Sequence, residues 1–175
     1  MTGKERIIRI LNHQPVDRVG LFEHFWDDTG KAWKTAGKLP DGVSYAKHFN
    51  FDIDEAGWFN PIADLDFERQ IVAEDEDTVT YLDGNGAVLR RHKKHDTTPE
   101  HVDFKVKEWD AWEEFIKPKL TPDPRRIDFE RYRKVRDECK QDNRFFVWSG
   151  LGPWECIETM CGHENMLVGM ALDPD

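Results

Sequence analysis

The segment that most constrains the fold is an apolar run that passes through a glycine-rich turn into a helix. Residues 145–148, FFVW, have the composition of a short buried strand, and residues 149–153, SGLGP, supply the turn. A helix is expected from Trp154 onward. Because a strand followed at once by a turn and a helix is typical of α/β folds, we expect a parallel sheet with helices packed on it.

Two earlier segments predict further strands of the same sheet. Residues 18–26 are dominated by Val, Leu, Phe and Trp, as expected of a strand covered on both faces, and residues 51–59 form a second run that ends at Asn60-Pro61. The expected helices begin at Thr2, with Glu5 in capping-box spacing, near Trp33, after Ser44, at Glu108 with an end at Pro118, and near Asp128 with a stripe through Cys139.

Residues 67–95 have a different pattern, which predicts a charged antiparallel hairpin inserted into the main body. Residues 78–82 carry β-formers, and the turn sequence DGNG at 83–86 tolerates positive φ before residues 87–91. On a helix, the side chains of His92 and His95 could bind one metal ion, but on a strand they point to opposite faces. We favour a solvated edge strand over a metal site here.

Composition excludes several classes of protein. The 175 residues carry a net charge of −10, and their Lys and Arg side chains are scattered, so we expect no nucleic-acid or membrane-surface partner. The longest apolar run, 166–172, is far shorter than the roughly 18 residues of a membrane helix, and no signal segment opens the chain. Three cysteines, an odd number, argue against a disulfide framework. We expect a cytoplasmic protein.

Ionisable residues gather at the carboxyl end of the first predicted strand. Glu23, His24, Asp27 and Asp28 follow its apolar part, and ligands bind at that edge of parallel sheets. Alternation lets only one of Glu23 and His24 face the site. We select Glu23, His24 and Asp28 as candidate catalytic residues for acid–base chemistry, and a solvated strand end is an equally weighted alternative.

The glycine-rich turn is the second candidate site. Its backbone would approach a ligand closely, but it lacks the Walker lysine and the G-x-G-x-x-G spacing, so a tight turn is the favoured interpretation. The candidate substrate-binding residues are the tryptophans expected to line an apolar pocket, together with two polar neighbours: Trp26, Trp58, Trp148, Trp154, Asn60 and Ser149.

A zinc site formed by Cys156, Cys161 and His163 is disfavoured by its spacing. Cys156 and Cys161 are five positions apart, which separates their side chains by about 140° around a helix axis, so one face cannot present both. We therefore expect buried or half-buried thiols and no metal site in this part of the chain.

Three passages together resemble the uroporphyrinogen decarboxylase superfamily. They are TGKER at 2–6 with LNHQPVDRV at 11–19, FNFD at 49–52, and GLGPW at 150–154. The resemblance spans the chain and implies a (β/α)8 barrel, a fold of roughly 250 residues. This chain would then be the N-terminal part of one barrel domain, a partial TIM barrel with about three strand–helix units and the hairpin as an insertion.

The superfamily includes two kinds of enzyme, and the resemblance leaves both open. Decarboxylases remove acetate carboxyls of uroporphyrinogen without a cofactor, and they follow their first strand with an MRQAGR phrase that holds carboxylates. Here HFWDDT stands at 24–29, Asn60 stands near the position of the family's catalytic aspartate, and Thr159 near that of its tyrosine. These departures imply a substrate smaller or less anionic than uroporphyrinogen.

The alternative is zinc-assisted methyl transfer from a corrinoid protein, whose zinc ligands the resemblance places in the second half of the barrel, outside this chain. Relatives are often homodimers. A small-molecule substrate is implied in both cases. A non-catalytic fragment or binding module is the alternative of another class, because an incomplete barrel leaves strand edges unpaired.

Overall fold

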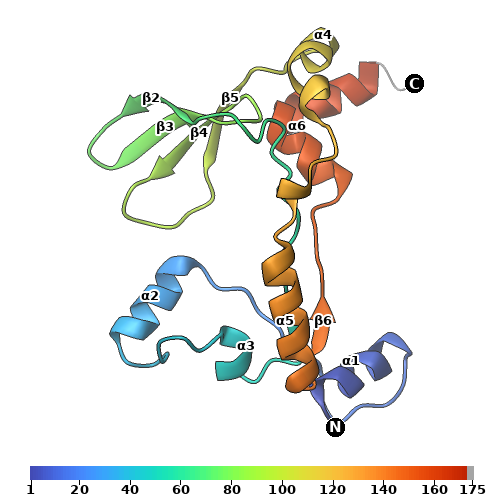
Figure 1. Cartoon of the computed structure of the whole chain (residues 1–175). Helices are drawn as coiled ribbons and strands as arrows, with labels where there is room; N and C mark the ends of the chain where they lie inside the picture. Colours follow the sequence, from blue (N-terminus) through green and yellow to red (C-terminus); the bar gives the residue numbers. More distant parts are fainter. Residues whose placement is uncertain (173–175) are drawn as a thin grey trace. The chain divides into compact units, whose positions relative to one another are not determined.

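The computed structural model of the chain describes residues 1–172 and has a mixed α/β fold (Figure 1). It consists of two compact units. The first contains residues 1–59 and 127–150, and the second contains residues 60–126 and the chain from Leu151 onward.

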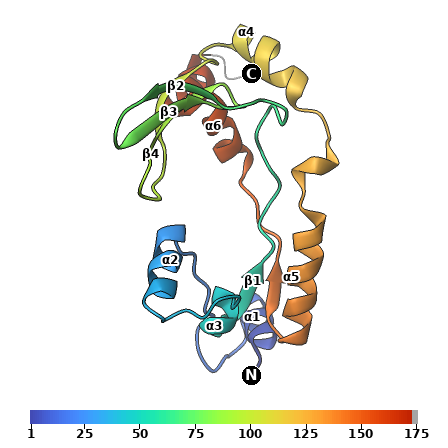
Figure 2. The same ribbon diagram turned by 60° about the vertical axis from the view of Figure 1, so that its left-hand side comes forward.

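The first unit is built on two parallel strands. Ile53 of β1 lies opposite Phe145 of β6, and Glu55 lies opposite Val147. Helices α1 and α5 pack on this pair (Figure 2). The elements are α1 (Gly3–Leu11), α2 (Asp27–Thr35), α3 (Tyr45–His48), β1 (Ile53–Glu55), α5 (Phe129–Gln141) and β6 (Phe145–Val147). The strands predicted over residues 51–59 and 145–148 are therefore confirmed, although both are shorter, and they pair in parallel as expected of an α/β sheet.

Local capping explains why three of these helices begin where they do. The Thr2 hydroxyl accepts from the Glu5 amide at 3.2 Å, and the Glu5 carboxylate accepts from the Thr2 amide at 2.9 Å. Each bond satisfies a helix-terminal N–H that has no partner within the helix. Ser44 caps α3 and Asp128 caps α5 in the same way. All three predicted helix starts are confirmed.

Apolar side chains hold the helices of this unit in place. Ala56 on the strand side packs against Val135 and Cys139 of α5. Phe25 forms edge contacts with Trp33 of α2 and Tyr45 of α3, at centroid distances of 4.9 and 5.1 Å. Such aromatic pairs stabilise a fold by more than the apolar area that they bury accounts for. They compensate for the small number of apolar residues on the helix around Trp33.

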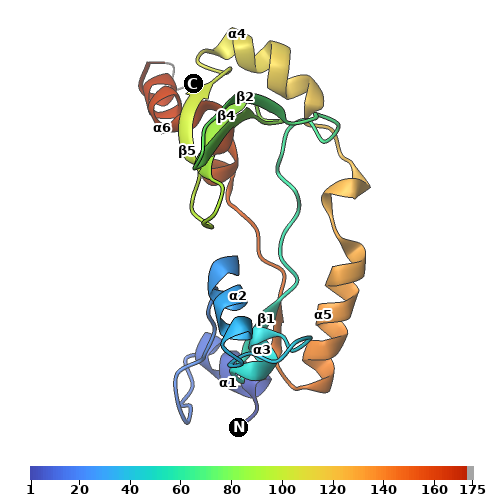
Figure 3. The same cartoon turned by 90° about the vertical axis from the view of Figure 1, so that its left-hand side faces the viewer.

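The second unit is a four-stranded antiparallel sheet in the order β2-β3-β4-β5, with α6 packed on β4 and β5 (Figure 3). Its elements are β2 (Gln70–Glu74), β3 (Thr78–Leu82), β4 (Ala87–His92), β5 (Glu100–Phe104), α4 (Trp109–Ala111), the π-helical turn η1 (Trp112–Ile116), the 3-10 turns η2 (Lys117–Lys119) and η3 (Pro124–Arg126), and α6 (Pro153–Leu172). The predicted hairpin is confirmed as β3 and β4, and β2 and β5 extend it.

The turn between β3 and β4 is set by its own sequence. The Asp83 carboxylate accepts from the amides of Asn85 and Ala87 at 2.9 and 3.0 Å. Gly86 has φ 74°, a conformation that glycine adopts without steric cost.

Helix α6 is broken at Gly162, where φ is 76° and ψ is 160°. A Cβ atom at this position would lie 2.5 Å from the Phe104 ring of β5. Glycine therefore permits both the kink and the close approach of the helix to the sheet. Met160 and Met166, on either side of the kink, are buried in the core of this unit together with Ala63, Val106 and Ile116.

The predicted first strand over residues 18–26 is wrong. These residues form no ladder, and Val19, Leu21 and Trp26 are exposed rather than covered on both faces. The physical reason is that the Leu21 amide donates to the Asp52 carboxylate at 2.8 Å. A side chain thus takes the donor that a strand ladder requires.

Two smaller expectations are also corrected. The strand β6 is half-buried rather than buried. β4 lies between β3 and β5 rather than at an edge, and His95 lies beyond its end, where its ring is 4.6 Å from that of His92. No helix among residues 1–172 combines the length and the apolar character required to cross a membrane.

Candidate functional site

A cavity of about 540 Å³ lies in the first unit, where β1 and β6 end. Glu55 is the last residue of β1, and Ser149 follows the last residue of β6 by two positions. The side chains that give the cavity its chemistry are apolar Phe22, Ile53, Trp58 and Val147 and polar His24, Glu55 and Ser149. The carboxyl ends of parallel strands are the usual place for a ligand site.

The Glu55 carboxylate connects the two other polar groups of the cavity. Ser149 Oγ donates to Glu55 Oε2 at 2.7 Å, and His24 Nδ1 lies 3.5 Å from Glu55 Oε1. Because the serine donates to the carboxylate and not to the imidazole, this is not the arrangement that activates a serine nucleophile. An imidazole beside a carboxylate is suited to proton transfer.

A group of charges around buried Arg6 and Asp52, which we call the Asp52 clamp, fixes the segment that carries His24. The clamp consists of Arg6, Asp17, Arg18, Leu21 and Asp52. The buried Asp52 carboxylate accepts from Arg6, from Arg18 at 2.6 and 3.1 Å, and from the Leu21 amide at 2.8 Å. The Asp52 amide in turn donates to the Leu21 carbonyl at 2.9 Å.

The clamp also sets the protonation state of Asp52. Burial opposes ionisation of this carboxyl, but the hydrogen bonds from Arg18 and Leu21 and the charge of Arg6 outweigh it, so the pKa of Asp52 lies below its ordinary value of 3.8. Hydrogen bonds from Arg6 lower the pKa of Asp17 as well. The clamp is therefore ionised at neutral pH.

The clamp aligns two chain segments whose ends meet at the cavity. Leu21 precedes His24 by three residues, and Asp52 precedes Glu55 by three residues. Holding Leu21 beside Asp52 therefore brings His24 beside Glu55. Arg6, Asp17, Arg18 and Asp52 lie outside the lining of the cavity, so these four side chains support the site rather than line it.

Of the three predicted catalytic residues, the structure places one in the lining of the cavity and two outside it. His24 lines the cavity. Glu23 is exposed, outside the lining, and its carboxylate accepts from the His24 amide at 2.9 Å. Asp28 lies in the first turn of α2, 3.5 Å from Lys31.

The predicted substrate-binding residues are also divided. Trp58 and Ser149 line the cavity. Trp26 is exposed before α2, and the Trp148 ring lies 6.3 Å from that of Tyr132 on α5. Asn60 and Trp154 belong to the second unit; Asn60 accepts from the Ile62 amide, and the Trp154 ring lies 6.2 Å from that of His163.

Sequence reasoning missed Glu55 and Phe22. Glu55 is an acid at the carboxyl end of a predicted strand, which is the same signal that selected Glu23 and His24. Alternation also places it on the same face as Ile53. Applying that rule to residues 51–59 would have found it.

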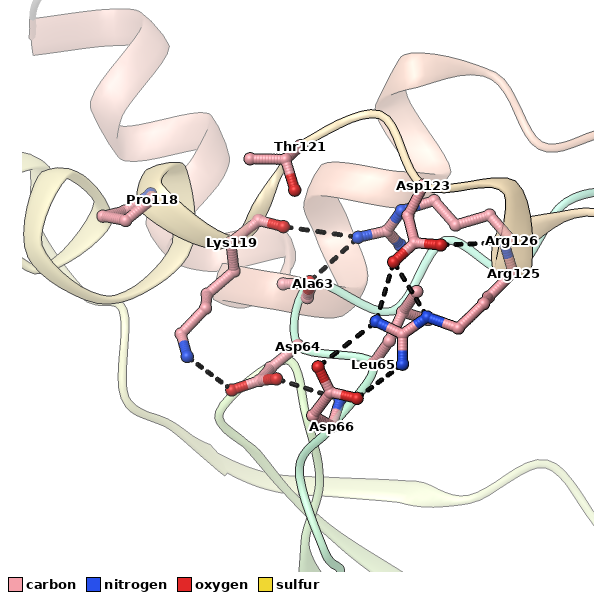
Figure 4. A pocket seen from close by; sticks show the side chains of 10 residues that line it. All are labelled: Ala63, Asp64, Leu65, Asp66, Pro118, Lys119, Thr121, Asp123, Arg125 and Arg126. Carbon is pink, nitrogen blue, oxygen red and sulfur yellow. Dashed lines mark hydrogen bonds and ion pairs between the residues drawn. The ribbon is translucent and has the colours of Figure 1, made fainter.

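A second pocket, of about 130 Å³, lies in the second unit (Figure 4). Arg125 pairs with Asp66 and Asp123, at 2.6 and 2.7 Å, and Lys119 pairs with Asp64 at 2.9 Å. These opposite charges bind one another, and Arg126, which also lines the pocket, donates to the carbonyls of Ile62 and Ala63, so the arrangement stabilises loops.

Cys156 of α6 is half-buried and Cys161 is buried, as the sequence predicts. Burial raises the pKa of the Cys156 and Cys161 thiols, and the charges of Glu155 and Glu158 raise it further. Among residues 1–172, no three His, Cys, Asp or Glu side chains are grouped as ligands of a metal ion.

Comparison of the chain with protein-family models, with curated proteins and with solved structures finds no match.

Proposed function

We propose that this chain provides the N-terminal part of an enzyme similar to the uroporphyrinogen decarboxylase superfamily, which binds a small molecule in the cavity at the ends of β1 and β6. The observation that carries the proposal is the Glu55 carboxylate, which accepts from Ser149 and lies beside His24 at that edge. Barrels and open α/β sheets bind substrates at the same edge.

The topology of the first unit supports a partial barrel. β1, α5 and β6 follow one another within the unit as a strand, a helix and a parallel strand, which is the repeating unit of a barrel. Residues 60–126, with the antiparallel sheet, are inserted in the connection between β1 and α5. We propose that these two strands are neighbours in a (β/α)8 sheet.

The proposed reaction is the loss of a carboxyl group as CO₂. The bond between the carboxyl carbon and its neighbour breaks, and the electron pair left on the neighbour takes a proton from the imidazolium of His24. Nδ1 of His24 faces Glu55, so Nε2 is the donor. Glu55 stabilises the imidazolium, and the exposed ring regains its proton from solvent.

The lining of the cavity supports a substrate other than uroporphyrinogen. No Arg or Lys is among its lining residues. A substrate carboxylate 4 Å from Glu55 would cost about 4 kcal/mol at an effective dielectric of 20. The volume of about 540 Å³ suits one small molecule. We therefore propose a smaller, less anionic substrate.

The zinc-assisted alternative adds no step here, because the described residues of this chain do not fit a zinc site. Its chemistry would depend on residues outside this sequence.

The test is CO₂ release from a panel of small carboxylic acids incubated with the protein in D₂O. The product should carry deuterium on the carbon that lost its carboxyl group. We expect His24→Asn to lower the rate by roughly 10²- to 10⁴-fold. An unchanged rate in this variant would contradict the proposed role, and no release from any acid would favour a non-catalytic binding module.

A further inference from the structure

The cavity has a negative character that no Lys or Arg side chain of its lining offsets. Glu55 is its one carboxylate, with a side chain only 23 % exposed, and the lining contains no ammonium or guanidinium group. A partly buried charge requires a partner or strong hydrogen bonds.

Glu55 retains acceptor capacity toward the cavity. A carboxylate has about four acceptor positions, and Ser149 occupies one of them at 2.7 Å. The 3.5 Å separation from His24 Nδ1 exceeds the usual N–H···O range of about 2.7–3.2 Å. A cationic N–H donor from a ligand would bind this carboxylate at about 2.7–2.9 Å.

The apolar wall of the cavity favours the same kind of ligand. Phe22 and Trp58 line it, and the faces of aromatic rings attract ammonium groups, Trp most strongly. An anionic group would instead meet the Glu55 charge without an ammonium or guanidinium group among the lining residues.

From these three observations we infer that the ligand of this cavity is a small organic cation, with an ammonium-type nitrogen held between Glu55 and the Trp58 ring. The inference names the substrate class of the site and rests on the proposed function. The leaving carboxyl group would then belong to an amine-bearing acid whose nitrogen is anchored at Glu55.

The test is a ¹H–¹⁵N NMR titration with methylammonium chloride, with sodium acetate and sodium chloride at equal ionic strength as comparisons. We expect saturable shifts of the Trp58 indole N–H and the Ser149 and Gly150 amides with methylammonium, and none with acetate. Trp148 is an internal control, because its side chain is similarly exposed but lies outside the lining. Saturation by acetate, or equal shifts at Trp148, would overturn the inference.

Matched variants separate the site from the general negative charge of the protein. We expect Glu55→Gln to weaken methylammonium binding at least tenfold, and Glu23→Gln, which changes a nearby carboxylate outside the lining, to change it less than twofold. Equal weakening in both variants would refute the role of Glu55. Should Glu55→Gln fail to fold, Trp58→Leu tests the cation site instead. We expect this variant to bind tetramethylammonium about two- to fivefold more weakly than the wild type. Unchanged binding would refute the cation site.

Failure of the cation site can be distinguished from failure of the proposed function. Methylammonium binding with CO₂ release that does not require His24 would remove the proposed reaction and leave the cation site. A reaction that requires His24, in a cavity that binds acetate but no cation, would remove the cation site alone.

Discussion

Replacing Asp52 with Asn tests whether the Asp52 clamp holds the first unit together. The change preserves the size of the side chain but removes the charge that faces Arg6 and Arg18, and an amide cannot accept all four hydrogen bonds of the carboxylate. The Asp52 side chain is only 3 % exposed. Breaking a buried ion pair in this way costs roughly 3–5 kcal/mol, so we expect the free energy of unfolding to fall by that amount.

Urea denaturation followed by tryptophan fluorescence measures the effect, with Arg18→Gln and Arg136→Gln as a matched pair. Their side chains are 41 % and 38 % exposed, but Arg18 binds buried Asp52 and Arg136 binds exposed Asp137. We expect a loss of about 1 kcal/mol for Arg18→Gln and less than about 0.5 kcal/mol for Arg136→Gln. A wild-type urea midpoint for Asp52→Asn, or equal losses of unfolding free energy in the two arginine variants, would refute the stabilising role of the Asp52 clamp.

Two further predictions concern acid stability and the kink of α6. Folding lowers the pKa of Asp52, so the stability that this carboxylate contributes is complete above its ordinary pKa of 3.8 and is lost as the pH falls through the folded pKa. Between pH 5 and about pH 2, the wild type should therefore lose more free energy of unfolding than Asp52→Asn, as measured by urea titration. Parallel plots of this free energy against pH for the two proteins would contradict the prediction. Gly162→Ala should lower the thermal midpoint, because it adds a Cβ at φ 76° and 2.5 Å from Phe104, whereas Gly169→Ala, with no atom within 4 Å of the new Cβ, should raise it or leave it unchanged. Equal effects of the two alanines would refute the packing argument.

The sequence predicts those parts of the fold that depend on near neighbours. The capping box of Thr2 and Glu5 and the turn at Asp83 are formed by residues at most four positions apart. Their hydrogen bonds are the same in any fold that contains the segment, so local pattern is sufficient.

Features that depend on distant residues were not predictable in this way. Residues 18–26 have a strand composition, but Asp52, 31 positions from Leu21, takes the amide that a ladder requires. The candidate site has the same origin, because Glu55 meets Ser149 across 94 positions. Sequence pattern selected His24 and Ser149 separately; the pairing of β1 with β6 brings Ser149 to the Glu55 carboxylate, and the Asp52 clamp brings His24 to it.

The proposed reaction requires that the proton is transferred beside Glu55 in the cavity and not beside the exposed carboxylate of Glu23. The most direct test compares the rate of CO₂ release by Glu55→Gln and Glu23→Gln on an acid that the wild type decarboxylates. We predict a loss of roughly a hundredfold or more for Glu55→Gln and a rate close to wild type for Glu23→Gln. A wild-type rate for Glu55→Gln together with a large loss for Glu23→Gln would contradict the account.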